Sequence, residues 1–134
     1  MKGQLFMPRP IVKCVFIAGM GGKEIIEILT HLAIYTKPND RVVISPHRKI
    51  LELRKYLFHS PYRLYDELCL HENAQFYQII CLQKSSHLPQ VSLYGDKLWL
   101  DKTGKEYLKH QVSALKSHQD AASKEYLRYL AQLN

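Results

Sequence analysis

With 134 residues, of which 46% are hydrophobic and 23% charged, the chain is long enough for one domain with a modest core and is not a disordered protein. The apolar run of residues 14–18 is too short to span a bilayer, and the basic start lacks the apolar region and cleavage site of a signal peptide, so we expect no membrane partner. Cys14, Cys69 and Cys81 are odd in number, lack metal-ligand spacing and lie in apolar segments. They predict buried, reduced thiols, no metal site and a cytoplasmic location.

The first predicted element is a strand over residues 12–18, whose near-continuous apolar run is typical of a strand covered by helices on both faces. It leads into a glycine-rich turn at residues 19–22, where glycine permits backbone conformations that side chains forbid. A helix over residues 23–35 follows, with Ile25 and Leu29 on its apolar face. This order is typical of an α/β sheet whose ligands bind at the carboxyl ends of the strands.

The next segments repeat this alternation of strand and helix. Residues 37–40 predict a turn, and residues 41–45 predict a short strand that Pro46 stops. Residues 48–59 predict a second helix, which Pro61 ends.

A β-hairpin is predicted after this second helix. Residues 62–71 and 75–83 are rich in residues that favour strands. Glu72, Asn73 and Ala74 separate them, and Asn73 suits a turn that requires a positive φ.

The last thirty residues, from Lys105 to Asn134, contain neither glycine nor proline, which predicts a long helix or a helical hairpin broken near residues 117–118. Eight residues of this tail are spaced alternately four and three positions apart, which is a heptad pattern with one polar interruption, and we call them the seam. A seam of this length has to be buried, either against the chain's own domain or against another helix or subunit. Its residues are Leu108, Val112, Leu115, Gln119, Ala122, Tyr126, Tyr129 and Leu133.

Positive charge is concentrated between residues 41 and 63, where six basic residues face a single acidic one. Such a local excess suits the phosphate backbone of a nucleic acid, because each neutralised phosphate releases counterions. The alternative is a solvated basic helix face without a partner. For Arg54 a second alternative is that its stem packs along the helix and its head pairs with a neighbouring carboxylate. The candidate phosphate contacts are Arg48, Lys49, Arg54 and Lys55, with Lys105, Lys109 and Lys116 as secondary contributors.

Five segments carry motifs in a fixed order. Residues 17–22 read Ile-Ala-Gly-Met-Gly-Gly, residues 43–47 read Val-Ile-Ser-Pro-His, and residues 53–57 read Leu-Arg-Lys-Tyr-Leu. Residues 66–80 hold Asp-Glu, Glu-Asn and Phe-Tyr-Gln-Ile-Ile, and residues 94–108 begin with Tyr-Gly-Asp and end with Tyr-Leu. Taken together, these segments resemble the bacterial tRNA (adenine(22)-N1)-methyltransferase family.

The resemblance implies an α/β chain with a partial Rossmann-like methyltransferase fold, the second half of the sheet, followed by a helical or coiled-coil extension. Residues 1–84 would form the C-terminal half of the methyltransferase domain, and residues 85–134 the extension. It also implies methyl transfer from S-adenosylmethionine to N1 of an adenine in tRNA. In that reaction the nitrogen is held in line with the sulfonium methyl and a proton is removed.

The resemblance also implies the site residues. Gly19, Met20, Gly21 and Gly22 would line the place where the methyl donor meets the target base, and substrate-binding residues would follow at the next strand end. A tight strand-to-helix turn is the structural alternative for the glycines, and a plain surface position is the alternative for the histidine. The substrate-binding residues are Ser45, Pro46 and His47, the first and last of which replace the family's Gln and Asn.

The family's first glycine-rich loop and its ribose-binding acidic residue have no counterpart in the sequence. We therefore expect a fragment that is inactive when isolated, binds S-adenosylmethionine weakly and associates with a second copy or with a separate N-terminal half. Two other functions stay open at this point. The chain could be a non-catalytic RNA-binding module, or an assembly protein that dimerises through its helical tail.

Overall fold

The computed structural model describes residues 13–93, 95–115, 124–125, 127–128 and 131. The predicted strands and the first two helices are confirmed, with bounds that differ by a few residues. The heptad seam predicted beyond Leu115 lies largely outside the described residues. The elements are β1 (Cys14–Met20), α2 (Gly22–Leu32), β2 (Arg41–Pro46), α3 (Ile50–Phe58), β3 (Arg63–Glu72), β4 (Gln75–Gln83), the 3-10 helix η1 (Asp96–Leu100) and α4 (Lys102–Leu115).

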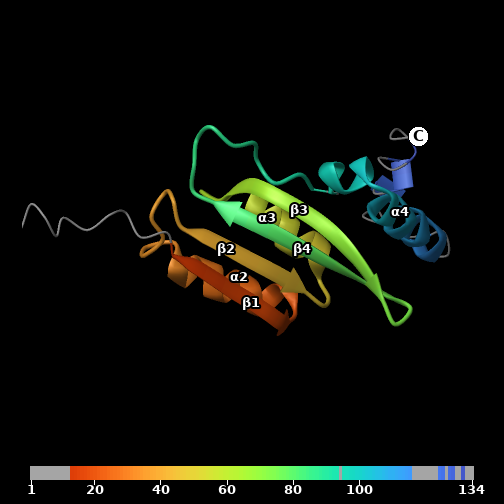
Figure 1. Cartoon of the computed structure of the whole chain (residues 1–134), viewed down its shortest axis with the longest axis horizontal. Coiled ribbons are helices and arrows are strands. Elements are labelled where there is room, and N and C mark those ends of the chain that lie inside the picture. Colours follow the sequence, from red (N-terminus) through yellow and green to blue (C-terminus); the bar gives the residue numbers. More distant parts are fainter. Residues whose placement is uncertain (1–12, 94, 116–123, 126, 129–130, 132–134) are drawn as a thin grey trace, which may run out of the picture.

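The four strands form one sheet in the order β1-β2-β4-β3. β1 and β2 are parallel and are connected through α2, whereas β4 lies between β2 and β3 and is antiparallel to both. Figure 1 shows α2 and α3 on the same side of the sheet, behind the strands. The arrangement confirms the predicted α/β class.

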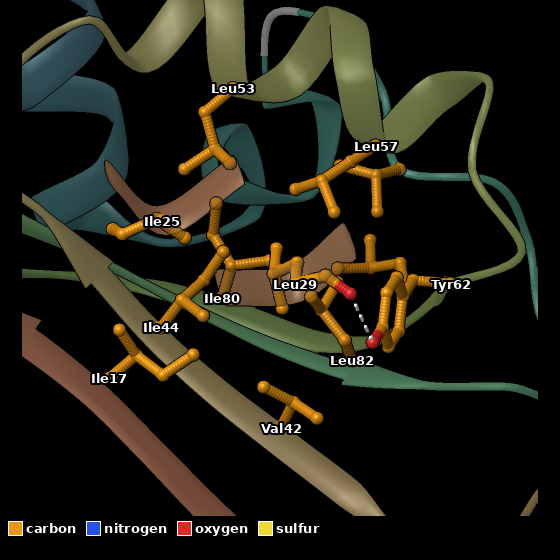
Figure 2. Close-up of a cluster of buried hydrophobic side chains, with 12 residues drawn as sticks. Ile17, Ile25, Leu29, Val42, Ile44, Leu53, Leu57, Tyr62, Ile80 and Leu82 are labelled. Atoms are coloured by element: carbon orange, nitrogen blue, oxygen red, sulfur yellow. Dashed lines mark hydrogen bonds between the residues drawn. The ribbon is translucent and has the colours of Figure 1, made fainter. Parts of the chain in front are cut away.

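The core lies between the sheet and these two helices. Ile25 and Leu29 of α2 are four residues apart, and so are Leu53 and Leu57 of α3, so each pair lies on one side of its helix and is fully buried. Figure 2 shows these side chains above the sheet, together with the hydroxyl of Tyr62, which donates a hydrogen bond to the Leu29 carbonyl oxygen at 3.1 Å. The strands contribute Ile17, Val42, Ile44, Leu64, Ile80 and Leu82.

The opposite face of the sheet is not covered by α2 or α3. Phe16 of β1 is 73% exposed, and its neighbours across the ladder, Val43 and then Cys81, are half-buried. The prediction of a buried strand covered on both faces is therefore wrong, since in β1 only Ile17 is buried. An apolar run shows that both faces of a strand are apolar but not that both are covered. We call the face that carries Phe16, Val43, Cys81, Leu68 and Leu70 the open face.

The two edges of the sheet differ in the described part of the chain. At the β3 edge, the backbone N–H of Leu64 donates to the Pro89 carbonyl oxygen at 2.8 Å, and Arg63 forms a bridge with Gln90. β1 pairs with β2 alone among the described strands. An unpaired strand edge presents N–H and C=O groups that another chain can pair with.

The hairpin between β3 and β4 turns on two residues in left-handed conformations. Asn73 has a φ of 52° and Ala74 a φ of 62°. Two consecutive positive φ values fit the twist of the flanking strands, as in a type I′ turn. The positive φ predicted for Asn73 is confirmed, whereas nothing in the sequence indicated one for Ala74.

Candidate functional site

The carboxyl ends of β1 and β2 bring two predicted site segments into direct contact. The backbone N–H of His47 donates to the Met20 carbonyl oxygen at 3.0 Å, and that of Gly22 donates to the Arg48 carbonyl oxygen at 2.7 Å. Because the strands are parallel neighbours, both loops leave the sheet at the same edge, where α/β sheets bind ligands. Residues 19–22 and 45–48 therefore form one small surface.

Each glycine of the first loop meets a different physical demand. Gly19 has a φ of 76° and lies where the β1–β2 register shifts, so the strand bulges there. A Cβ on Gly22 would collide with the backbone carbonyl of Lys49, so the two loops can approach only through glycine. A Cβ on Gly21 would meet the flexible side chains of Glu24 and Arg48, at 2.7 Å and 2.9 Å. The close packing of the two loops thus accounts for Gly22 without any ligand.

Gly19 and Met20 are the exposed part of this loop, whereas Gly21 and Gly22 are buried. Apart from its chain neighbours, the described residues bring only the Nε2 atom of His47 within 4 Å of the place where a Cβ of Gly19 would stand, at 3.9 Å. The backbone at Gly19 is consequently open to a ligand, and an imidazole borders the opening.

The second segment consists of the last two residues of β2, Ser45 and Pro46, and of His47, which follows the strand. Ser45 is half-buried, Pro46 is buried as the last residue of β2, and His47 is exposed. The structure places this trio beside residues 19–22, as the resemblance implied, while their substrate-binding role stays a prediction.

Basic side chains continue from this loop onto the surface. The Arg48 side chain is 74% exposed and 3.8 Å from the Glu24 carboxylate, and the Lys49 side chain is 62% exposed and 3.9 Å from that of Glu52. Exposed pairs at such distances contribute only about 0–1 kcal/mol, so both cations can turn towards a phosphate. Lys55 of α3 and Lys105 and Lys109 of α4 are exposed as well.

A family model described as a methyltransferase domain matches residues 3–80, more than half of the chain. The chain belongs to the methyltransferase domain family. The matched part of this methyltransferase domain extends from residue 3 into β4 and includes both loops of the site. No curated protein matches the sequence.

Solved structures share the fold of this domain at low sequence identity. The B. subtilis M1A22 tRNA methyltransferase TrmK aligns with a TM-score of 0.54 and 21% identity, over 91% of this chain and 62% of that one. TrmK of M. capricolum, in complex with S-adenosyl-homocysteine, aligns with a TM-score of 0.58 and 19% identity, over 98% of this chain and 62% of that one. A Streptococcus pneumoniae protein considered a tRNA (m1A22) methyltransferase, in complex with S-adenosyl-L-methionine, aligns with a TM-score of 0.68 and 19% identity, over 91% of this chain and 60% of that one.

The chain thus spans about 60% of the length of these structures. The predicted resemblance to the tRNA (adenine(22)-N1)-methyltransferases is confirmed as a likeness of fold. The predicted class, part of a Rossmann-like methyltransferase sheet, is confirmed with it.

One predicted nucleic-acid contact is wrong. The side chain of Arg54 is 2% exposed, and its Nη2 atom lies 2.6 Å from the Glu67 carboxylate, whose side chain is fully buried. The same guanidinium donates to the Gln78 side-chain oxygen at 2.8 Å and to the Ser92 carbonyl oxygen at 3.0 Å. Arg54 therefore stabilises the interior of the methyltransferase domain and cannot reach a phosphate. This agrees with the alternative interpretation, in which its guanidinium pairs with a neighbouring carboxylate.

This buried network extends to α4. The Gln78 amide nitrogen donates to the Tyr107 hydroxyl at 2.7 Å, so α3, β3, β4 and α4 are joined through polar side chains. Two features of the sequence indicate this network. Glu67 interrupts a strand rich in apolar residues, and both Arg54 and Glu67 lie in the motif segments described above. Nothing in a single sequence shows that these two segments meet.

The thiols divide by burial, and the prediction that all three are buried is wrong for Cys14. Cys14 is exposed on β1, Cys81 is half-buried and Cys69 is buried, and all are free. Burial raises the pKa of Cys69 to about 11 and also raises the pKa of Cys81. Among the described residues, no cluster of His, Cys, Asp or Glu could hold a metal, and no helix there is long and apolar enough to cross a membrane.

Proposed function

We propose that this methyltransferase domain forms the part of an S-adenosylmethionine-dependent methyltransferase that positions the methyl acceptor, an adenine of tRNA. The observation that carries the proposal is the contact between the Gly19–Gly22 turn and the Ser45–Arg48 segment at the carboxyl ends of two parallel strands. Neighbouring structures whose names include tRNA methyltransferase, and whose complexes hold the methyl donor or its product, support the choice of reaction.

The geometry at Gly19 fits the methyl end of the donor and a planar base. The positive φ and the absence of a side chain leave backbone open at the strand end, with the half-exposed Met20 beside it. S-adenosylmethionine supplies an electrophilic methyl group on a sulfonium. The residues of this chain would position the adenine, since holding a nucleophile in line is the main catalytic contribution such a site can make.

Transfer RNA would be held mainly by phosphate contacts. Arg48 and Lys49 stand at the rim of the two loops with weak ionic partners, and Lys55, Lys105 and Lys109 are exposed on the helices. Such contacts position an RNA without reading its sequence. Arg54 is not part of this surface because it is buried.

We also propose that methyl transfer requires a further polypeptide segment on the β1 edge, from a separate nucleotide-binding half or a second copy. Three of the six glycines of the chain lie in residues 19–22 and the other three are isolated, so the sequence holds a single glycine-rich loop. The β1 edge, which has no partner other than β2 among the described strands, and the exposed Phe16 offer a parallel strand and a helix a place to dock. Alone, the 134-residue chain should bind the donor weakly.

A chimera tests the proposal directly. Residues 13–115 of this chain would replace the matching part of the B. subtilis enzyme, and methyl incorporation into unmodified tRNA would be measured with a labelled donor. We expect transfer to adenine N1 and its loss in the Gly19→Val chimera, because a β-branched residue cannot adopt the conformation of Gly19 without strain. Circular dichroism checks that both chimeras fold.

The alternative function is a non-catalytic RNA-binding module, favoured by the exposed basic residues that follow the two loops. A folded chimera that binds tRNA but transfers no methyl group would establish this alternative. If the natural chain shows no salt-dependent binding of tRNA, both functions are refuted. The remaining hypothesis is then an assembly protein.

A further inference from the structure

A cavity of about 380 Å³ borders the second loop of the site, where Pro46 and His47 line it. It is bounded by the β2–α3 segment (His47 and Ile50), by the start of β4 (Gln75 and Phe76) and by α4 (His110). The volume falls within the range of about 300–1,000 Å³ that pockets for small ligands occupy. The cavity therefore has the size for a single heteroaromatic ring system.

Aromatic side chains belong to the lining of this cavity, among them Phe76, Tyr107 and His110. Phe76 stacks on His71 with centroids 4.2 Å apart and an interplanar angle of 11°. The rings of Tyr107 and His110 on α4 each lie with their centroids 5.6 Å from that of Phe76. Phe76 is only half-buried, so this aromatic group is supported by the protein yet open to the cavity. Unstacked nucleobases bind to aromatic groups of this kind.

The remaining wall offers neutral hydrogen-bonding groups. Gln111 supplies a side-chain amide and His47 an imidazole. The described lining contains neither a carboxylate nor a lysine or arginine, so it suits the uncharged edge of a base rather than a phosphate.

The cavity and the proposed methyl-transfer loop share one residue. His47 lines the cavity, its backbone N–H is bonded to the Met20 carbonyl oxygen, and its Nε2 atom borders Gly19. The exposed cations Arg48 and Lys49 follow it in the chain, outside the lining. A ring in the cavity would therefore sit beside the loop, with its sugar-phosphate backbone near positive charge.

We propose that this cavity binds an unstacked nucleobase of the RNA, stacked on Phe76 and held at its edge by Gln111 and His47. The proposal rests on the proposed function, because it takes RNA as the ligand. It adds a base-binding site that is separate from the phosphate contacts and is built by the hairpin and α4 together. The buried hydrogen bond from Gln78 to Tyr107 fixes α4 against the hairpin and so keeps the cavity open.

The test measures the affinity of the full chain for tRNA across a salt series, in the natural protein and in three variants. Phe76→Leu keeps an apolar side chain but removes the ring face, and we expect Kd to rise about tenfold with an unchanged salt slope. Phe76→Trp should retain the affinity. Phe16→Leu is the matched control, because it makes the same exchange on the open face, and its Kd should equal that of the natural chain.

The outcomes separate this inference from the function on which it rests. If the natural chain binds tRNA and Phe76→Leu binds it equally well, the base-binding site is refuted and the proposed function stands. If the natural chain does not bind tRNA, both are refuted. Should Phe76→Leu fail to fold, the exposed His110→Ala variant replaces it, with a several-fold rise in Kd expected and an unchanged Kd refuting the site.

Discussion

Replacing Arg54 with methionine should destabilise this domain more than any change to its surface charges. The substitution keeps much of the side-chain volume but removes the positive charge that lies 2.6 Å from the buried Glu67 carboxylate. It also removes the hydrogen bonds that Arg54 donates to Gln78 and to the Ser92 carbonyl oxygen. The second oxygen of Glu67 has no hydrogen-bond partner among the described residues of the natural chain, so we expect the remaining carboxylate to be buried without compensation.

The expected loss follows from the burial of both partners. Removing one partner of a buried ion pair costs about 3–5 kcal/mol, because the other charge stays in a medium of low polarity. A domain of this size has a total stability of about 5–15 kcal/mol, so Arg54→Met should remove a large share of it. Replacing both residues, in Arg54→Met/Glu67→Met, removes the orphaned charge and should recover part of this loss.

Urea denaturation followed by far-ultraviolet circular dichroism at pH 7 measures these free energies of unfolding. Arg48→Met serves as the control, because it removes the same kind of charge from a surface pair with N–O 3.8 Å apart and should cost less than about 1 kcal/mol. The reasoning fails if Arg54→Met is no more destabilising than Arg48→Met. It fails equally if the double variant loses the full sum of the two single losses.

Four other outcomes are expected. The Arg48→Ala and Lys49→Ala variants should each lower the slope of log K against log salt for tRNA by about 0.7–0.9, and an unchanged slope would remove that residue from the RNA surface. Calorimetric titration of the 134-residue chain with S-adenosylmethionine should show no micromolar affinity, and a Kd in that range would contradict the need for a further segment. In sedimentation the chain should self-associate at high micromolar concentration and Phe16→Lys should do so less, whereas a monodisperse natural monomer would show that the open face needs no cover. Alkylation of Cys69 should accelerate as the pH approaches its raised pKa of about 11, and rapid labelling at pH 7 would contradict its burial. The folded state should lose stability between pH 9.0, the ordinary thiol pKa, and about 11, because the unfolded chain releases the Cys69 proton first.

The order of strands and helices could be predicted because each element carries its own local signal. Alternating apolar positions, the Gly19–Gly22 turn and the helix-ending Pro61 all act within a few residues. The coverage of β1 could not be predicted, since an apolar strand looks the same in sequence whether one face or both are packed. Phe16 shows the difference, because only its surroundings in space leave it exposed.

The site was predicted less completely than the fold, for a related reason. The sequence indicated residues 19–22 and 45–47, and their proximity follows from parallel pairing of neighbouring strands. Arg54 was misassigned because positive charge along a helix says nothing about which face is buried. Its partner Glu67 lies on another element, and a pairing of this kind becomes visible only in three dimensions.

The position of β4 between β2 and β3 also bears on how the chain folds. A two-residue turn joins β3 to β4, so the hairpin closes a short loop and can form early. The pairing of β4 with β2, as in Val43 with Cys81, closes a loop that contains all of α3 and β3. Contacts between residues so distant in the chain form slowly. The hairpin should therefore dock on β2 as a finished unit, and the Ile80 and Leu82 side chains would leave water only at that late step.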